Sequence, residues 1–394
     1  MAYVHRMGLA VIAPELEAAF QLSAVALGLL GAAYFYPYSV MQIPVGILVD
    51  AIGPRTVLVV FVAIGALGST LFGMGGSYEL ALLGRFMVGL GVAAIYLSAQ
   101  RLFINWFDPR QFATLSGFLN AAGNLGGIFA SLPLVALSVA FGWQHVFVVA
   151  GGIMLGVAVL SAVAIKDCPS EQEGRYSEPR RGSEAWAAVR QGAGIVASKG
   201  YVWPLAAGLL PFVGTRFAFQ GLWGGPYLTE IYRLSAEEVG TLMMLMSLSV
   251  VVSSPVSGYL SDRVFRSRKW FAVGGMAANA LCWVPLAFAT DRLPVSSFYI
   301  IVILLGAFST MWLPVYAQAK ELHSPAVAGT VLAILQFATS FGGAVYQQLL
   351  GIVIGFFEKT PAGYPVAAYS AAFGFCLASA VFAALMILVS KEAR

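Results

Sequence analysis

Three arginines lie inside long apolar stretches of this sequence, where a charged side chain is costly and is therefore a candidate for function. Arg6 precedes Asp50 by 44 residues and Arg216 precedes Asp262 by 46, so these two arginines occupy nearly equivalent places in the two halves of the chain. A guanidinium presents a planar fork of donors that matches a carboxylate. We therefore expect Arg6 and Arg216 to face one cavity and bind a carboxylate or similar oxyanion. The alternative is that each is paired with backbone carbonyl groups or extends toward the membrane surface.

The other ionisable groups of the apolar stretches are few. Arg85 lies nearer the end of its stretch, so it either braces neighbouring helices or contacts substrate. No Asp or Glu lies in the middle of an apolar stretch, which disfavours cationic substrates and leaves proton coupling without a carboxylate. His5 is the one remaining group whose ordinary pKa suits proton exchange. It is our candidate for coupling, and a plain hydrogen-bonding role is the alternative.

Polar side chains recur at helical spacing along several apolar stretches. Residues four apart lie on one side of a helix, so these sets are expected to line the cavity with the arginines. Membrane helices also use such residues for hydrogen bonds between helices. The expected lining residues are Tyr34, Tyr38, Asn120, Asn124, Trp312, Tyr316 and Gln336, with Gln42, Ser116, Ser340 and Gln347 on the same faces.

The composition indicates a membrane-embedded protein. Of 394 residues, 59% are hydrophobic and 10% are charged, whereas an average soluble domain has about 25% charged residues. A helix needs about 20 apolar residues to cross the hydrocarbon core, where backbone groups find no other hydrogen-bond partners. Turn and charge signals divide the chain into segments that predict an all-α polytopic membrane protein with twelve transmembrane helices. The segments are 1–20, 24–49, 56–75, 80–104, 112–138, 143–165, 201–224, 237–260, 270–289, 297–318, 326–357 and 365–390.

Basic residues are distributed unevenly over the loops that this division implies. With the N-terminus in the cytoplasm, most of the 22 Lys and Arg residues fall on the cytoplasmic side. The outer loops hold only Arg233, Arg292 and Lys359. The positive-inside rule then places both termini in the cytoplasm, and we expect the membrane to be the bacterial inner membrane.

A long polar stretch, residues 166–200, divides the chain nearly in half. It is rich in Pro, Ser, Gly and mixed charge, which is typical of a solvated linker. Its tail, Ser183 to Ala197, is expected to form a short helix on the membrane surface, with Ser183 as the N-cap.

The two halves of the chain repeat each other. The sequence GILVD at Gly46 to Asp50 reappears as GYLSD at Gly258 to Asp262. We therefore predict two pseudo-symmetric six-helix bundles, residues 1–165 and 201–394. Repeats of this kind place the substrate site near the middle of the membrane, at their interface.

The run Gly46-Ile-Leu-Val-Asp50-Ala-Ile-Gly53-Pro-Arg55 ends the second predicted span. Gly46 has no side chain, so another helix can approach it closely. Asp50 can pair with a nearby Arg or accept hydrogen bonds from the first amides of a packed helix. A contact of this kind that forms in one conformation only would act as a latch on alternating access, and the alternative is a turn with a solvated Asp. We assign gating and latch roles to Gly46, Asp50, Gly53, Arg55, Arg85, Asp262 and Arg263.

Two motifs resemble signatures of the major facilitator superfamily. The run from Gly46 to Arg55 is similar to its Gly-x-Leu-x-Asp-x-x-Gly-x-Arg motif, and Arg85-Phe-Met-Val-Gly89-Leu-Gly91 to its Arg-x-x-x-Gly-x-Gly motif. The resemblance covers essentially the whole chain and implies the fold of that superfamily, with a latch role for the first motif. The second copy of this motif is degraded: it keeps Gly258, Leu260, Asp262 and Arg263 but has Arg266 in place of the second Gly.

The first apolar segment resembles, more narrowly, that of the anion:cation symporters, which include carriers of sugar acids, sialic acid and glutamate. The match rests on Tyr3-Val-His5-Arg6 and the later Ala-Val-Ile-Ala-Pro, and it implies that Arg6 contacts a substrate carboxylate. Two residues depart from the pattern of this branch at positions that concern proton symport. His5 stands where the branch often has Asp, and Val92 stands where it tends to have Glu. The run Gly123-Asn124-Leu-Gly126-Gly127 is similar to the helices of nitrate and nitrite porters, but the second segment lacks the Arg that those porters have.

Together these features predict a secondary active transporter that moves a small organic anion, a carboxylate, by alternating access. The coupling partner would be a proton or a cation. A carrier of zwitterionic solutes such as amino acids or short peptides, a nitrate/nitrite-type porter and an exporter of amphipathic compounds are the alternatives.

An enzyme is not expected. The sequence shows no Ser/His/Asp set and no phosphate-binding loop, and its three cysteines and three histidines form no metal-binding cluster. We expect no cofactor, no metal and no nucleic-acid partner. The protein is expected to act as a monomer in the lipid bilayer.

Overall fold

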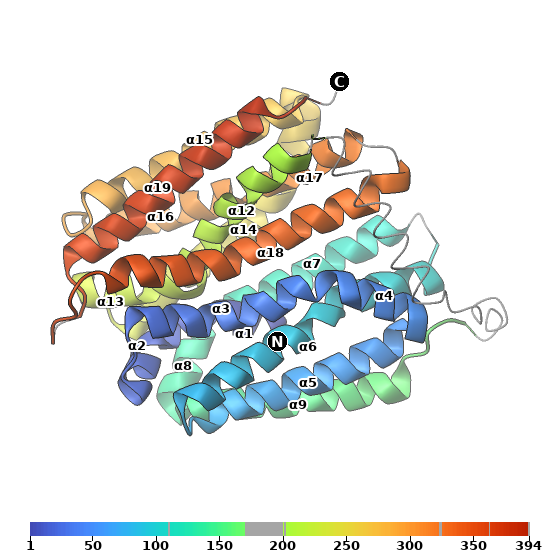
Figure 1. Cartoon of the computed structure of the whole chain (residues 1–394), viewed down its shortest axis with the longest axis horizontal. Coiled ribbons are helices and arrows are strands. Elements are labelled where there is room, and N and C mark those ends of the chain that lie inside the picture. Colours follow the sequence, from blue (N-terminus) through green and yellow to red (C-terminus); the bar gives the residue numbers. More distant parts are fainter. Residues whose placement is uncertain (109–110, 170–199, 201, 323–324, 362, 393–394) are drawn as a thin grey trace.

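The computed structural model describes residues 1–108, 111–169, 200, 202–322, 325–361 and 363–392. Throughout these ranges the chain forms helices that run side by side along one axis, with turns between them (Figure 1). The proposed surface helix from Ser183 to Ala197 lies outside the described residues.

Helices of the first half of the chain pack chiefly on one another. α5 packs against α6 and α9, and α3 packs against α6. In order, they are α1 (Ala2–Met7), α2 (Leu9–Phe20), α3 (Ala24–Val40), α4 (Gln42–Ile52), α5 (Pro54–Met74), α6 (Tyr78–Trp106), α7 (Phe112–Phe129), α8 (Leu132–Phe141) and α9 (Trp143–Ala164).

The second half of the chain forms a corresponding set, in which α12 packs against α18 and α19, and α15 packs against α19. Three short non-α turns interrupt its helices. The elements are α12 (Val202–Ala218), the π-helical turn η3 (Phe219–Trp223), α13 (Gly224–Tyr232), α14 (Ala236–Tyr259), the π-helical turn η4 (Leu260–Phe265), α15 (Arg268–Phe288), α16 (Val295–Phe308), the 3-10 turn η5 (Ser309–Met311), α17 (Trp312–Glu321), α18 (Pro325–Gly355) and α19 (Val366–Val389).

The helices match the predicted spans in order. Within the described ranges, nine helices are long and apolar enough to cross a membrane, or up to eleven if each of two bent pairs is one span. These pairs are α3 with α4, bent by 46°, and α7 with α8, bent by 47°. The first predicted span consists of α1 and α2, which are separate short helices. The seventh extends beyond its predicted end at residue 224, through α13 to Tyr232.

Local sequence explains where several helices begin. The hydroxyls of Ser23, Ser77 and Ser267 accept hydrogen bonds from the backbone amides three residues later, which satisfies a free donor at each helix start. Ser235 forms a capping box with Glu238 at the start of α14. These caps fix the turns that join consecutive helices.

The outer faces of the helices expose large apolar side chains. Val163 is 81% exposed, Phe288 77% and Leu281 70%. Contiguous apolar surface of this kind is typical of contact with lipid or with a partner, and these helices have the length to span a bilayer.

We refer to the two ends of the helix assembly by their connections. The linker end is the one where α9 ends at Ala164 and α12 begins at Val202. The hairpin end is the opposite one, where α2 leads into α3 and α13 leads into α14 (Figure 1).

Candidate functional site

The first and seventh spans are interrupted near mid-length, and the two interruptions touch. A Cβ atom added at Gly225 would lie 1.6 Å from the carbonyl oxygen of Ala10, and one added at Gly221 would lie 3.1 Å from that of Arg6. Only glycine allows backbones from the two halves to approach so closely. π-helical turns such as η3 recur at functional sites, and interrupted helices form the central sites of many carriers.

Arg6, at the end of α1, is almost fully buried and is surrounded by aromatic rings. It is 9% exposed, and its Nε has no hydrogen-bond partner among the described residues. Aromatic faces stabilise a guanidinium without neutralising its charge, so this charge stays available to an anion. Its Cζ lies 4.7 Å from the centre of the Tyr38 ring, 5.0 Å from Tyr3, 5.6 Å from Phe217, and 5.7 Å from both Tyr34 and Phe35.

Arg216, near the end of α12, is held by a chain of hydrogen bonds. Its Nε donates to Oε1 of Gln220 at 3.2 Å, and Nε2 of Gln220 donates to the Ser247 hydroxyl at 2.9 Å. The Ser247 hydroxyl lies 3.4 Å from the carbonyl oxygen of Gly127, in the first half of the chain. The Arg216 guanidinium also lies 5.5 Å from the centre of the Phe217 ring, which adjoins Arg6 as well. The structure therefore brings the two arginines to one place, one from each half.

The contacts of Arg85 fit the first of its two expected roles, which was to brace neighbouring helices and not to contact substrate. It is 1% exposed, and it donates to the carbonyl oxygens of His5 at 2.6 Å and Leu30 at 3.4 Å. Its guanidinium adjoins the rings of Tyr34 and Phe72. Arg85 thus ties α6 to α1 and α3, inside the first half and away from the linker end.

His5 is fully buried next to this brace. Both of its ring nitrogens lack a hydrogen-bond partner in the part of the chain that the structure describes. Its ring lies 5.1 Å from that of Phe147, measured between centres. Its role as a coupling residue stays a prediction.

Two of the lining residues predicted in the first half adjoin Arg6. Tyr34 and Tyr38 are stacked, with ring centres 6.0 Å apart, and both face the guanidinium. Asn124 is half-buried on α7. The side chain of Asn120 lies outside the described residues.

The lining residues predicted in the second half form a connected group. The Tyr316 hydroxyl donates to Oε1 of Gln336 at 3.3 Å, and it lies 3.2 Å from the Thr339 hydroxyl. The ring of Trp312 lies 5.1 Å from that of Tyr316.

The acidic residues of both repeated motifs pair within their own halves. Asp50 lies 3.6 Å from Arg101, and Asp262 lies 2.7 Å from Arg268. Arg268 also pairs with Glu321 at 2.7 Å. Arg263, to which the sequence analysis also gave a latch role, is exposed.

The rest of the first motif is anchored to the end of α9. The backbone amide of Arg55 donates to Oδ1 of Asp167 at 2.7 Å, and the Arg55 guanidinium donates to the carbonyl of Ala162. Gly53 has φ +87°, and a Cβ there would lie 2.7 Å from Oδ2 of Asp167. Gly53 therefore permits the turn and the close approach of Asp167 together.

The first glycine of each motif faces open space. A Cβ added at Gly46 or Gly258 would meet no described atom within 4 Å. No described residue therefore makes the close helix approach that was expected at Gly46. Both glycines lie toward the linker end, at equivalent positions of the repeated motif. No described helix packs closely against either of them.

The hairpin end, in contrast, is tightly joined. A Cβ added at Gly28 on α3 would lie 2.8 Å from the carbonyl oxygen of Gln347 on α18, and one at Gly351 would lie 2.5 Å from that of Ala24. The backbone amide of Ala24 also donates to the Tyr364 hydroxyl at 2.8 Å. These contacts join the two halves of the chain.

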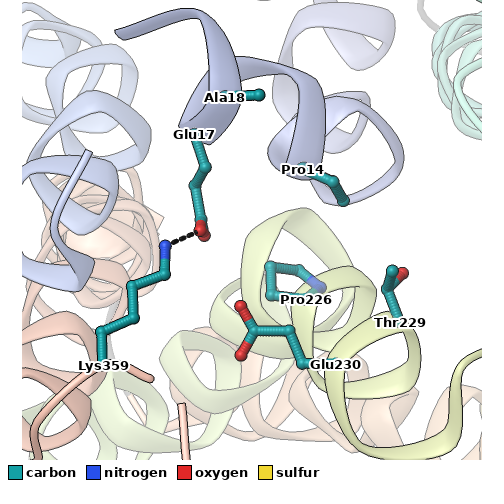
Figure 2. Close-up of a pocket in the computed structure, with 7 residues that line it drawn as sticks. All are labelled: Pro14, Glu17, Ala18, Pro226, Thr229, Glu230 and Lys359. Atoms are coloured by element: carbon teal, nitrogen blue, oxygen red, sulfur yellow. Dashed lines mark hydrogen bonds and ion pairs between the residues drawn. The ribbon is translucent and has the colours of Figure 1, made fainter. Parts of the chain in front are cut away.

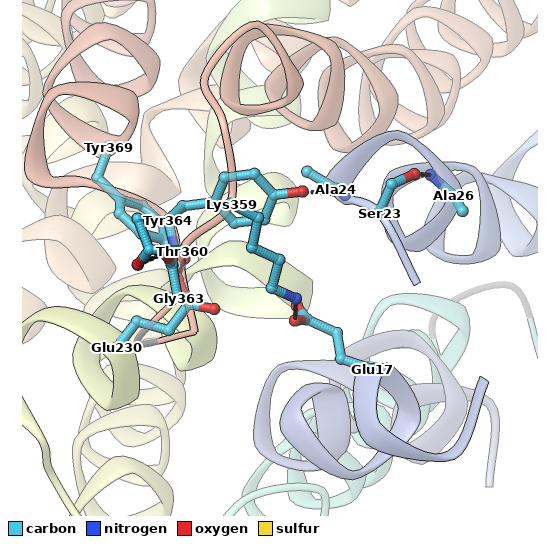
Figure 3. Close-up of polar contacts among 10 residues, drawn as sticks. All are labelled: Glu17, Ser23, Ala24, Ala26, Glu230, Lys359, Thr360, Gly363, Tyr364 and Tyr369. Carbon is cyan, nitrogen blue, oxygen red and sulfur yellow. Dashed lines mark hydrogen bonds and ion pairs between the residues drawn. The ribbon is translucent and has the colours of Figure 1, made fainter. Parts of the chain in front are cut away.

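A group of charged residues, which the sequence analysis did not identify as a site, completes this end. Lys359, in the loop after α18, pairs with Glu17 on α2, and Figure 3 shows the two side chains reaching toward each other from opposite halves. Glu230 on α13 accepts hydrogen bonds from the Tyr364 amide at 2.8 Å and the Tyr369 hydroxyl at 2.9 Å. Glu17 and Lys359 are 342 residues apart in the sequence, so no local pattern could have found the pair.

These charges border a small cavity of about 240 Å³ (Figure 2). Burial alone would lower the pKa of Lys359, but the hydrogen bond and charge of Glu17 and the charge of Glu230 outweigh burial and raise this pKa. Lys359 therefore stays protonated and paired at neutral pH. The cavity is lined by Pro14, Glu17, Ala18, Pro226, Thr229, Glu230 and Lys359.

Removing the Glu17–Lys359 pair is expected to loosen the hairpin end. A partly exposed pair contributes about 0.5–1 kcal/mol, so Glu17→Gln or Lys359→Met should increase labelling of a Thr229→Cys reporter by a membrane-impermeant thiol reagent about two- to fivefold. The double variant should label no faster than either single variant. Arg292→Gln, which removes an exposed basic side chain paired only with Asp291 at 3.9 Å, is the control. Unchanged labelling in both single variants would show that the pair does not hold this end closed.

The comparisons with known proteins identify the family. The family model described as Major Facilitator Superfamily matches residues 1–346 and 212–394. The chain is 26% identical to a probable sulfoacetate transporter, SauU, of Cupriavidus necator, over 74% of this chain and 70% of that protein. It is 24% identical to the hexuronate transporter of Bacillus subtilis, over 98% of this chain and 90% of that one.

A solved structure agrees on the fold. The bacterial homologue of the human lysosomal transporter Spinster superimposes with a TM-score of 0.75 at 18% identity, over 99% of this chain and 93% of that one. This structure agrees with the predicted fold, and the family match identifies a transporter rather than an enzyme. The chain is an integral membrane protein with many apolar helices and belongs to the major facilitator superfamily of transporters.

Proposed function

We propose that this protein is a secondary active carrier of a small organic anion, which Arg6 and Arg216 bind between the two halves of the chain. One observation carries the proposal. Two guanidiniums, that of buried Arg6 and that of partly buried Arg216, adjoin the same aromatic ring, and no ion pair among the described residues joins either to a carboxylate. Buried charges are ordinarily paired, so an anionic ligand is the partner that this site lacks. The two relatives described above, which transport organic acids by name, support the same class of substrate.

Transport proceeds, in this proposal, by alternating access of the central site. The hairpin end is joined by backbone contacts and the Glu17–Lys359 pair, whereas Gly46 and Gly258 toward the linker end face open space. In the opposite state the hairpin end separates and helices close over the two motif glycines. Asp50 and Asp262 would then exchange their partners within each half, Arg101 and Arg268, for partners across the interface.

The orientation in the membrane follows the distribution of basic residues. The linker end and both termini face the cytoplasm, and the hairpin end faces outward across a bacterial inner membrane. Residues 1–165 and 201–394 act as the two moving bundles around the linker 166–200, and one chain is the functional unit.

Coupling to a proton or cation completes the proposal, with His5 as the candidate group. Its two unpartnered ring nitrogens lie one residue from Arg6, and its carbonyl oxygen is held by Arg85. A proton on this imidazole would therefore be close to the substrate and to the brace of the first half.

A thermal-shift screen of the purified protein tests the proposal. Ligands that bind the folded state raise the melting temperature, so carboxylates and sugar acids are expected to raise it by several degrees at concentrations far above their Kd. Nitrate, dipeptides and cationic dyes are the comparison set, and Arg292→Ala serves as the control variant. Stabilisation by dipeptides or dyes without stabilisation by carboxylates would overturn the proposal in favour of a zwitterion carrier or an exporter.

A further inference from the structure

The interior of the protein has an unbalanced charge. Arg6, Arg85 and Arg216 lie within the helices, and none forms an ion pair in the described parts of the chain. Arg85 donates to two neutral carbonyl oxygens, those of His5 and Leu30, which hold it inside the first half. Arg6 and Arg216 are the two positive charges that adjoin one ring, where a single ligand could neutralise both.

These two charges act within one small space. The Cζ atoms of Arg6 and Arg216 lie 5.6 and 5.5 Å from the centre of the same Phe217 ring. The separation of the two Cζ atoms is therefore no greater than the sum of these two distances. In a site of low dielectric constant, like charges at such a separation repel, and a single negative charge would leave one of them uncompensated.

The two guanidiniums are fixed separately and in different ways. Four rings of the first half and Phe217 of the second surround Arg6, whereas Gln220 and Ser247 orient Arg216 through the second half. Each is thus prepared to receive an acidic group without rearrangement, which favours binding because little conformational freedom is lost.

We propose that the carried anion has two acidic groups, a dicarboxylate or a sulfonate–carboxylate, with one group bound at Arg6 and the other at Arg216. This inference rests on the proposed function, of which it specifies the substrate class. Sulfoacetate, named for one relative, has two acidic groups, and a hexuronate, named for another, has one. The names of the relatives are therefore consistent with a substrate that has one acidic group or two. The two positive charges of this site favour a substrate with two acidic groups.

Such an anion would join the two halves of the chain, because the arginines belong to opposite halves. Gln220 then becomes a positioning residue for specificity, since its Oε1 accepts a hydrogen bond from the Arg216 guanidinium at 3.2 Å. Binding of the second acidic group, at Arg216, would depend on this orientation, whereas binding of the first group, at Arg6, would not.

The test compares ligands that differ by one charge and little else. Binding to the full-length purified protein is measured for malonate, succinate, glutarate and adipate, and for sulfoacetate, each against the monoamide of the same length, at a pH where all acids are ionised. In the wild type we expect at least one diacid to bind about tenfold or more tightly than its monoamide, as is typical for loss of one partner of a buried charge pair.

Variants at Arg216 test whether this residue binds the second acidic group of the ligand. In Arg216→Gln the ratio of diacid to monoamide affinity should fall to about one, while the affinity for the monoamide stays within about threefold of the wild type. Arg216→Lys should restore part of the preference, which separates loss of charge from misfolding. Gln220→Leu should reduce the preference for the diacid and leave monoamide binding in place.

The outcomes distinguish this inference from the proposed function. Equal affinity for diacids and monoamides in the wild type would overturn the two-acid inference and leave an anion carrier in place. A preference for diacids that persists in Arg216→Gln would overturn the assignment to Arg216. If no acid of either series binds, the proposed function itself is wrong.

Discussion

Replacement of Arg6 by alanine is expected to abolish uptake of the anionic substrate. Arg6 supplies a buried positive charge whose Nε has no partner in the described chain, so its removal takes away the main attraction for an acidic group. Truncating one partner of a buried charge pair costs about 2–5 kcal/mol, which lowers affinity at least about 30-fold. Uptake of labelled substrate into proteoliposomes, together with the melting temperature of the purified variant, measures the effect.

Two controls separate binding from folding in this experiment. Arg6→Lys keeps the charge but loses the planar fork, so it should retain weak uptake. Arg292→Ala removes an arginine whose side chain is 83% exposed at the hairpin end, and it should leave uptake unchanged. Normal uptake by Arg6→Ala and by Arg216→Ala would show that the anion hypothesis is wrong, and both arginines would then be structural.

Replacement of Gly225 by alanine is expected to prevent the hairpin end from closing. The new Cβ would lie 1.6 Å from the carbonyl oxygen of Ala10, and both partners are backbone, so neither can move aside as a flexible side chain could. Overpacking of this kind costs about 1–3 kcal/mol, which shifts the ratio of closed to open molecules about 5- to 150-fold. The Thr229→Cys reporter should label faster, and the rate of uptake should fall.

Gly374→Ala is the matched control, because a Cβ at Gly374 on α19 would meet no described atom within 4 Å. The same substitution there should change neither labelling nor uptake. If Gly225→Ala transports and labels as the wild type does, the contact between the two interrupted spans is not required for the transport cycle. A lower melting temperature with unchanged labelling would assign Gly225 to stability alone.

Several features of the site could be predicted from single residues. Arg6 and Arg216 were identified by charge in an apolar stretch and by their equivalent positions in the repeat, and the structure brings both to the Phe217 ring. Tyr34 and Tyr38 followed from helical spacing, and both adjoin Arg6. Such predictions are possible because helix geometry fixes which residues share a face.

Other features required the folded chain. Asp50 has Arg101 as its partner, and Arg85 braces α1 and α3 instead of lying with the motif residues. The η3 turn follows Ala218 without a sequence signal that the apolar pattern could show. Each of these depends on which helices are neighbours, and hydrophobicity in membrane helices says little about that, since lipid and protein both accept apolar side chains.

By itself, the sequence determined that this protein is helical and spans a membrane, that its two halves share a repeated motif, and that the charged residues inside its apolar stretches are arginines. Apolar length, the need to satisfy backbone groups in lipid and the cost of a buried charge act along the chain, so they can be read from it. Only the tertiary structure decided that Glu17 meets Lys359, that Gly225 meets Ala10, and that two arginines converge at one ring with no ion pair to a carboxylate among the described residues. These contacts join residues hundreds of positions apart, and they arise from how the two halves pack.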